Sequence, residues 1–295
     1  MDLAEISKLC KDIEKKSGKG SIFTVGKNAS LQIPRWQTRI EALDNIIGGG
    51  MPKGRIIEIF GPESSGKTSL TYWLMSLHSL GLYIPIEGTY DEKRALQMGV
   101  QKGKMIVHRA NYGEEALNDV LKFAKAGIPI IGLDSVPACQ PKDDITKIEK
   151  DAENEVRIGG VARLFSKMLP SIVRTCEESG TTLILINQVR DNMNAMLFGD
   201  KDTTPGGRAI KFYSSLRIKV ARRTWIEIPN KNPNISANTE KVGLIMKAKV
   251  QKSKVSNPFA ECEMPFFFDR GFVGYDDIVS IRKELMKQRR EQYNT

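Results

Sequence analysis

The stretch that most constrains this chain covers residues 61–69, which read GPESSGKTS. It satisfies the pattern G-x-x-x-x-G-K-[ST], whose fixed positions are filled by Gly61, Gly66, Lys67 and Thr68. A β-branched run at residues 55–60, RIIEIF, precedes it and indicates a buried strand, and apolar residues at helical spacing follow between residues 69 and 80. Because strand, glycine-rich turn and helix is the context in which this pattern binds phosphate, a chance match is the weaker interpretation.

The residue types of this segment suit a nucleoside triphosphate. Small residues let backbone N–H groups surround the phosphates, and the N-terminus of the following helix adds partial positive charge. Lys67 supplies a point charge to the terminal phosphates, and the Thr68 hydroxyl can ligate Mg²⁺. The residues predicted to contact the nucleotide in this segment are Gly61, Glu63, Ser64, Ser65, Gly66, Lys67, Thr68 and Ser69.

Composition excludes several classes of protein. With 40% hydrophobic and 27% charged residues the chain is typical of soluble globular proteins, and no apolar run approaches the roughly 20 residues of a membrane span. The first residues do not form a signal peptide, and the four cysteines are scattered without a C-x-x-C pair, which favours the cytoplasm. Neither histidine, His78 or His108, has another ligand type at metal-binding spacing, so both are predicted to be ordinary surface or core residues.

The net charge of +10, with a pI near 9.3, indicates a polyanionic partner, and nucleic acid is the first candidate. A charge that serves only solubility is the alternative. The distribution of basic residues along the chain has to decide between the two.

Buried apolar strands alternate with helical segments along the chain, which predicts an α/β fold with a mostly parallel, doubly wound sheet. Ligands of such sheets bind at the carboxyl ends of the strands. Glu87, Asp134 and the pair Asn187-Gln188 each end an apolar run. Asp134 would hold Mg²⁺ through water, although an aspartate in this position can instead cap the next turn.

Five further segments shape the prediction. Residues 2–17 form an amphipathic helix, followed by a short strand at 21–25, and this arm packs either on its own chain or on a neighbouring subunit. The polar residues 137–160 and 191–208 predict loops, the second long enough to be functional. Residues 211–223 alternate like a strand, and residues 276–292 predict a basic helix with a thin apolar face.

Taken together, these segments resemble the bacterial-type RecA recombinase family over about residues 10–275. The similarity rests on residues 12–22, on GRIIEIFGPESSGKT at 54–68, LDS at 133–135, INQ at 186–188, FG at 198–199, GGRAIKFY at 206–213 and KSKVSNPF at 252–259. It implies a RecA-like P-loop core at 29–275, with a protomer-contact arm at 1–28. A short basic helix at 276–295 stands where the family continues into a C-terminal domain and an acidic tail.

The resemblance also implies roles for individual residues. Glu87 would activate the water that attacks the γ-phosphate of ATP, and Gln188 would sense that phosphate. Lys252 and Lys254 would reach the ATP of the next protomer. Positions that match the family's protomer contact are Lys211, Phe212 and Arg217, and those that match its adenine contacts are Asp91 and Tyr275.

Two DNA-binding loops are implied at about residues 155–160 and 189–208. The candidate DNA-contacting residues are Ile158, Gly159, Arg163, Ser166, Arg190, Met193, Gly206, Gly207 and Arg208. The sequence departs from the family at Pro85-Ile86, before the catalytic glutamate, at Arg94, where an aromatic residue stacks on adenine, and at Pro170, where an arginine faces DNA.

These observations lead to the hypothesis of an ATP-dependent DNA recombinase. It would form a helical filament on single-stranded DNA, with ATP and Mg²⁺ between protomers, and pair that strand with homologous double-stranded DNA. Two alternatives stay open at this point. One is a hexameric motor such as a replicative helicase, and the other is a DNA-coating filament protein that binds ATP and hydrolyses it weakly.

Overall fold

The computed structural model describes residues 2–18, 22, 33–88, 90–150, 159–191, 202–230 and 237–293. The chain divides into two compact units, residues 1–34 and 35–295. In the first, α1 (Leu3–Ser17) begins after Asp2, whose side chain accepts a hydrogen bond from the backbone N–H of Ala4 at 3.1 Å. Of the strand predicted at residues 21–25, all but Ile22 lies outside the described residues.

The second unit is built on a sheet that has nine strands within the described residues. From one edge to the other these are β13 (Gly271–Phe272), β12 (Glu261–Phe267), β11 (Thr239–Ser253), β10 (Leu216–Pro229), β3 (Ile56–Gly61), β7 (Thr182–Gln188), β6 (Ile130–Asp134), β4 (Gly81–Pro85) and β5 (Met105–Val107). Neighbours are parallel from β10 to β5 and antiparallel from β10 to β13. The mostly parallel sheet predicted from the sequence is confirmed. A separate antiparallel pair joins β1 (Arg35–Trp36) to β2 (Met51–Pro52).

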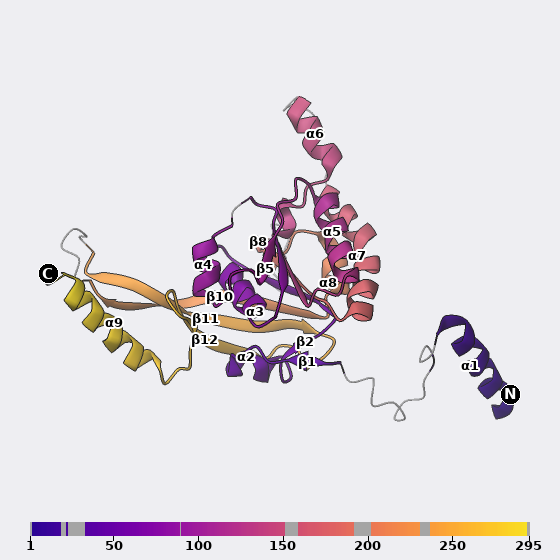
Figure 1. Ribbon diagram of the computed structural model, residues 1–295, viewed down its shortest axis with the longest axis horizontal. Helices are drawn as coiled ribbons and strands as arrows, with labels where there is room; N and C mark the ends of the chain where they lie inside the picture. Colours follow the sequence, from indigo (N-terminus) through magenta and orange to yellow (C-terminus); the bar gives the residue numbers. More distant parts are fainter. Residues whose placement is uncertain are drawn as a thin grey trace. The chain divides into compact units, whose positions relative to one another are not determined.

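Helices cover both faces of the sheet (Figure 1). One face packs against α2 (Glu41–Ile46), α3 (Lys67–Ser76) and α4 (Glu92–Gln97), and the other against α5 (Gly113–Lys125), α7 (Gly160–Ser179) and α8 (Gly207–Tyr213). Successive residues of a strand point to opposite faces, so Ile57 belongs to the first core and Ile56 to the second. Burial on both faces explains why these strands read as continuous apolar runs.

The antiparallel strands β10 and β11 extend beyond the parallel region, and α9 (Ile278–Tyr293) packs on them (Figure 1). Ile281 and Leu285 of this helix are buried against Ile226 and Ile245. The predicted basic tail helix therefore forms, with its thin apolar face on the sheet. None of the helices in the described ranges has the length and apolar character needed to cross a membrane.

Two predictions about local structure were wrong. The segment 137–160, predicted as a loop, contains α6 (Lys142–Lys150), whose first turn holds Asp143 and Asp144, where negative charge suits the helix dipole. Residues 211–213, predicted to begin a strand, end helix α8, which starts after Gly206 in a left-handed conformation. The strand β10 begins only at Leu216.

Candidate active site

The loop between β3 and α3 requires glycine at two places. Gly66 has φ of 88° and precedes the first residue of α3, and a Cβ there would collide with Met246. A Cβ at Gly61 would collide with the backbone carbonyl of Val220. The backbone therefore comes close to its neighbours while its N–H groups stay near the α3 N-terminus, the arrangement that receives phosphate.

Lys67 is the cation of this loop. Its Nζ donates to the backbone carbonyls of Gly61 at 3.1 Å and Pro62 at 2.7 Å. Burial lowers the pKa of Lys67 below its ordinary value, while the nearby carboxylates of Asp134 and Glu87 act in the opposite direction. The ammonium is thus held at the base of the loop between acidic neighbours.

Asp134, the last residue of β6, lies beside the loop. Its Oδ2 accepts hydrogen bonds from Thr68 Oγ1 at 2.9 Å and from the Tyr83 hydroxyl at 2.6 Å. Burial raises the pKa of Asp134, and the two hydrogen bonds oppose that rise. A hydroxyl and a partly buried carboxylate are hard oxygen ligands, and a cation would offset the carboxylate charge, so this pair fits Mg²⁺. Tyr83 was missed from the sequence because nothing distinguishes it from other residues of a buried strand.

Glu87 lies just beyond the end of β4, next to the ends of β6 and β7. Its Oε1 accepts a hydrogen bond from Ser135 Oγ, and the Gln188 side-chain amide donates to the same oxygen at 3.4 Å. The backbone N–H of Glu87 donates to the Asp134 carbonyl at 3.3 Å. Three strand ends therefore bring together the residues predicted for hydrolysis and phosphate sensing. Ser135 is the partner that sequence reasoning missed, although it directly follows the predicted Asp134.

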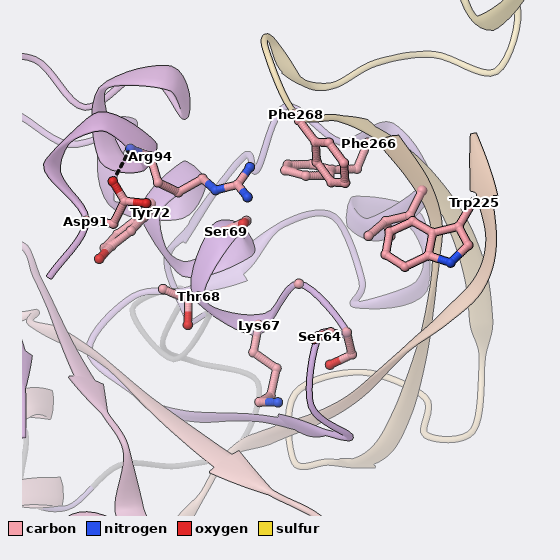
Figure 2. A pocket seen from close by; sticks show the side chains of 13 residues that line it. Ser64, Lys67, Thr68, Ser69, Tyr72, Asp91, Arg94, Trp225, Phe266 and Phe268 are labelled. Atoms are coloured by element: carbon pink, nitrogen blue, oxygen red, sulfur yellow. Dashed lines mark hydrogen bonds between the residues drawn. The ribbon is translucent and has the colours of Figure 1, made fainter. Parts of the chain in front are cut away.

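A cavity of about 420 Å³ opens over the loop (Figure 2). Residues 64–69 line one side of it, whereas Gly61 and Glu63 are not among its lining residues in the described part of the chain. The remaining lining residues are Tyr72, Asp91, Arg94, Trp225, Leu244, Phe266 and Phe268. This second group is mostly aromatic and apolar, as a nucleotide base requires.

Asp91 and Arg94 lie together at the start of α4 (Figure 2). Asp91 Oδ1 accepts from the Arg94 backbone N–H at 2.9 Å, and the Arg94 guanidinium carbon lies 5.4 Å from the centre of the Phe268 ring. Tyr275, also predicted at the adenine, instead donates to Glu263 at 2.5 Å and lines a neighbouring cavity. Its contact with adenine stays a prediction.

Five of the predicted DNA-binding residues lie where α7 and α8 begin. Gly159 and Gly206, both in left-handed conformation, precede the two helices, and a Cβ at Gly207 would lie 2.8 Å from Ala162 Cβ. Arg163 and Arg208 are exposed there. Two helix N-termini therefore lie side by side.

The remaining predicted DNA contacts are less fully described. Ser166 is exposed on α7, where its hydroxyl donates to the Ala162 carbonyl at 2.7 Å. Arg190 belongs to β8 (Arg190–Asp191), which pairs with β9 (Asp202–Thr203). Ile158 and Met193 lie outside the described residues.

Four of the predicted interface residues form one surface, which we call the Phe212 patch: Lys211, Phe212, Lys252 and Lys254. Phe212 is 65% exposed, and Lys254 Nζ lies 5.2 Å from the centre of its ring. Lys252 Nζ donates to the carbonyls at the end of α8, at 2.5 Å for Lys211 and 2.9 Å for Phe212. Burial, together with the positive charge of Lys254, lowers the pKa of Lys252 to about 8.

Arg217, also predicted at the protomer contact, lies inside the protein. Its side chain is 9% exposed, and its Nε donates to the fully buried carboxylate of Glu58. Nη2 of the same guanidinium donates to Thr204 Oγ1 at 3.3 Å, and Asn187 Nδ2 donates to Glu58 at 2.8 Å. This network ties the strand before the phosphate loop to the end of β7. A protomer contact through Arg217 stays a prediction.

Comparison with known proteins agrees with this geometry. The family model described as the RecA N-terminal domain matches residues 4–273. Protein RecA of Mycoplasma mycoides subsp. mycoides SC is 36% identical over 284 residues, which cover 94% of this chain and 78% of the relative. Protein RecA of Thermus aquaticus is 36% identical over 277 residues, which cover 92% of this chain and 78% of the relative. Protein RecA of Aquifex aeolicus is 34% identical over 280 residues, which cover 93% of this chain and 77% of the relative. The family model and the relatives match nearly the whole chain, including the phosphate loop and the sheet around it. The chain therefore belongs to the RecA family of DNA recombinases.

Proposed function

We propose that this recombinase is a DNA-dependent ATPase that assembles on single-stranded DNA and pairs the bound strand with homologous double-stranded DNA. The observation that carries the proposal is the position of Gln188. Its side-chain amide lies 3.4 Å from Glu87, and it is the last residue of β7, from which the chain enters the segment predicted to bind DNA. One residue therefore adjoins both the carboxylate proposed for hydrolysis and the start of the segment proposed to bind DNA.

The residues of the phosphate loop support ATP with Mg²⁺ as the bound species. When bound, Mg²⁺ neutralises negative charge on the terminal phosphates, and Thr68 and Asp134 are the residues that would hold it. Lys67 adds a positive charge from the base of the loop. Glu87 is proposed to take the proton of the water that attacks the γ-phosphate, so that ADP leaves as the bond to that phosphate breaks.

The start of α7 and α8 is the proposed DNA-contacting surface. Helix N-termini and arginine side chains bind phosphate oxygens, and Arg163 and Arg208 are exposed beside Gly159 and Gly206. A net charge of +10 favours the same partner. The four cysteines are free thiols, which is consistent with action in the reducing cytoplasm.

Assembly is proposed to use two surfaces. The apolar stripe of α1 is exposed, with Leu3 at 82% and Leu9 at 56%, and an apolar stripe of this kind gains stability when a partner covers it. The Phe212 patch provides an exposed aromatic ring flanked by lysines. Lys252 and Lys254 of this patch are proposed to reach the ATP of the next protomer.

ATP hydrolysis by the purified chain, measured without and with single-stranded DNA, tests the proposal. We expect strong stimulation by DNA, together with helical filaments in electron micrographs. Hydrolysis that does not respond to DNA, in a protein that still coats it, would favour the DNA-coating alternative. Closed rings in place of filaments would favour a hexameric motor.

A further inference from the structure

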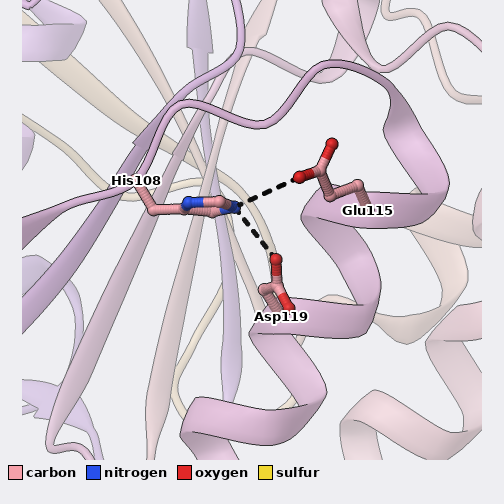
Figure 3. A group of neighbouring side chains, drawn as sticks. All are labelled: His108, Glu115 and Asp119. Atoms are coloured by element: carbon pink, nitrogen blue, oxygen red, sulfur yellow. Dashed lines mark ion pairs between the residues drawn. The ribbon is translucent and has the colours of Figure 1, made fainter.

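A second cluster of ligand-type side chains lies beside β5, the strand at the parallel edge of the sheet, and Figure 3 shows its three members. His108 follows β5, and Glu115 and Asp119 are one turn apart on the same side of α5. None of the three is among the described residues that line the nucleotide cavity. We propose that these three side chains bind a divalent transition-metal ion, for which Zn²⁺ is the natural probe.

The distances suit one shared ion. His108 Nε2 lies 2.9 Å from Asp119 Oδ2 and 4.0 Å from Glu115 Oε1, and one donor atom from each residue lies within 4.8 Å of the other two. Ligand atoms that bind zinc at about 2.0–2.2 Å are roughly 3–3.5 Å apart. Small side-chain rotations therefore bring all three donors to a common centre.

Each carboxylate is fixed through the oxygen that does not face the histidine. Glu115 Oε2 accepts from the backbone N–H of Asn111 at 2.8 Å and from its side-chain amide at 3.1 Å. Asp119 Oδ1 accepts from Lys122 Nζ at 2.8 Å. The other oxygen of each carboxylate is directed toward His108 (Figure 3). Supporting hydrogen bonds of this kind orient the ligands of protein metal sites.

The state of His108 Nε2 favours a metal over a simple ion pair. Within the described residues this nitrogen is shielded from solvent and makes no hydrogen bond, although Asp119 Oδ2 is close. The carboxylate oxygen is thus near the nitrogen but not in line with an N–H. A metal ion between the two would satisfy both, because the imidazole lone pair and the carboxylate would point at the ion and not at each other.

The donor set selects the kind of ion. One imidazole and two carboxylates suit borderline ions such as Zn²⁺ and Co²⁺, whereas Mg²⁺ takes oxygen ligands and demands an octahedral shell. Three protein ligands leave further positions for water. The sequence interpretation of His108 as an ordinary residue overlooked this cluster, because its three members follow no short metal-binding motif and come together only where the chain turns from β5 into α5.

Zinc titration of the full chain without nucleotide tests the site. Asp134→Asn serves as the background, because it removes the carboxylate of the phosphate loop as a competing site. We expect one equivalent of Zn²⁺ to bind, with affinity reduced at least about tenfold by Asp119→Asn or His108→Ala. Glu114→Gln, which removes a neighbouring carboxylate outside the cluster, is the matched control and should leave zinc affinity unchanged.

A spectroscopic readout separates the site from cysteine binding and from misfolding. With ¹⁵N-histidine, Zn²⁺ should shift the Nε2 resonance of His108 and leave that of His78 in place as an internal reference. Bound zinc should also raise the melting temperature of the Asp134→Asn background chain and of Glu114→Gln in that background, but not of Asp119→Asn in that background. If His108→Ala does not fold, the isosteric variants Asp119→Asn and Glu115→Gln still decide. Zinc binding that is equally tight in these variants, or an unshifted His108 resonance, would overturn the proposal.

Discussion

Glu87 shares one carboxylate oxygen with two donors, the Ser135 hydroxyl and the Gln188 amide. Glu87→Gln keeps an oxygen that can accept those bonds but cannot take a proton from water. We therefore expect the substitution to lower the rate of ATP hydrolysis by about 10²- to 10⁴-fold while ATP still binds. Steady-state hydrolysis and equilibrium nucleotide binding measure the two effects separately.

Ser135→Ala provides the comparison for this prediction. It keeps the proton-accepting carboxylate and removes only a donor that orients it, so a smaller loss of turnover is expected. Should Glu87→Gln hydrolyse ATP at the unsubstituted rate, Glu87 is not the base. If the two substitutions were equally severe, orientation and not proton transfer would limit the reaction.

Lys252 gives hydrolysis a pH dependence. Burial and the charges of Lys254 and Arg217 lower its pKa from 10.5 to about 8, so its ammonium loses charge as the pH rises through that value. If Lys252 stabilises the ATP of the next protomer, DNA-dependent hydrolysis should fall between about pH 7 and 9. Lys252→Arg, which stays charged throughout this range, should flatten the fall.

The effect of Lys252 on stability cannot account for this result, because its linkage to unfolding has the opposite sign. Between pH 8 and 10.5 the unfolded chain binds more protons at Lys252 than the folded chain does, so the contribution of this group to stability rises with pH. Activity and stability should therefore diverge. An identical pH profile for Lys252→Arg and the unsubstituted protein would remove Lys252 from this role.

Among the helices and strands, those whose residue pattern is set by burial could be predicted from the sequence, whereas those that depend on distant contacts could not. Strand β3 and the last residues of β6 and β7 were predicted to within about one residue, because a strand buried on both faces must be apolar throughout. The phosphate loop, Asp134 and Glu87 followed from their places at or just beyond strand ends. Helix α6 was missed because most of its residues are charged or polar, and helix α8 because seven residues are too few to show a helical repeat of apolar positions. The partners Ser135, Tyr83 and Asp119 depend on tertiary packing that no local pattern records.

Helix α7 contains Pro170 in its interior, on an exposed position. Proline has no N–H to donate to the carbonyl of Ser166, one turn earlier, and its ring crowds that carbonyl. Pro170→Ala should therefore raise the free energy of unfolding by about 1–3 kcal/mol. Chemical denaturation measures this change. A lower stability would mean that the packing of α7 against α5 is adapted to the proline.

For the molecule as a whole, the two proposed assembly surfaces differ in kind. One is the apolar stripe of α1, in the compact unit formed by residues 1–34, and the other is the lysine-flanked Phe212 patch of the unit that contains the sheet. Interfaces between unlike surfaces produce open helical filaments or closed rings, depending on whether the rotation between copies closes.

Leu9→Glu tests the contribution of the α1 stripe to assembly. It places a charge on the apolar face, where burial against a partner becomes unfavourable, so filaments on single-stranded DNA should be shortened or lost. Lys11→Gln is the matched control, because it changes the net charge by the same amount on an exposed position of the same helix. Light scattering and electron microscopy report assembly, while the melting temperature of the sheet-containing unit should stay unchanged in both variants. Equal effects of the two substitutions would show that charge, and not the apolar stripe, controls filament formation.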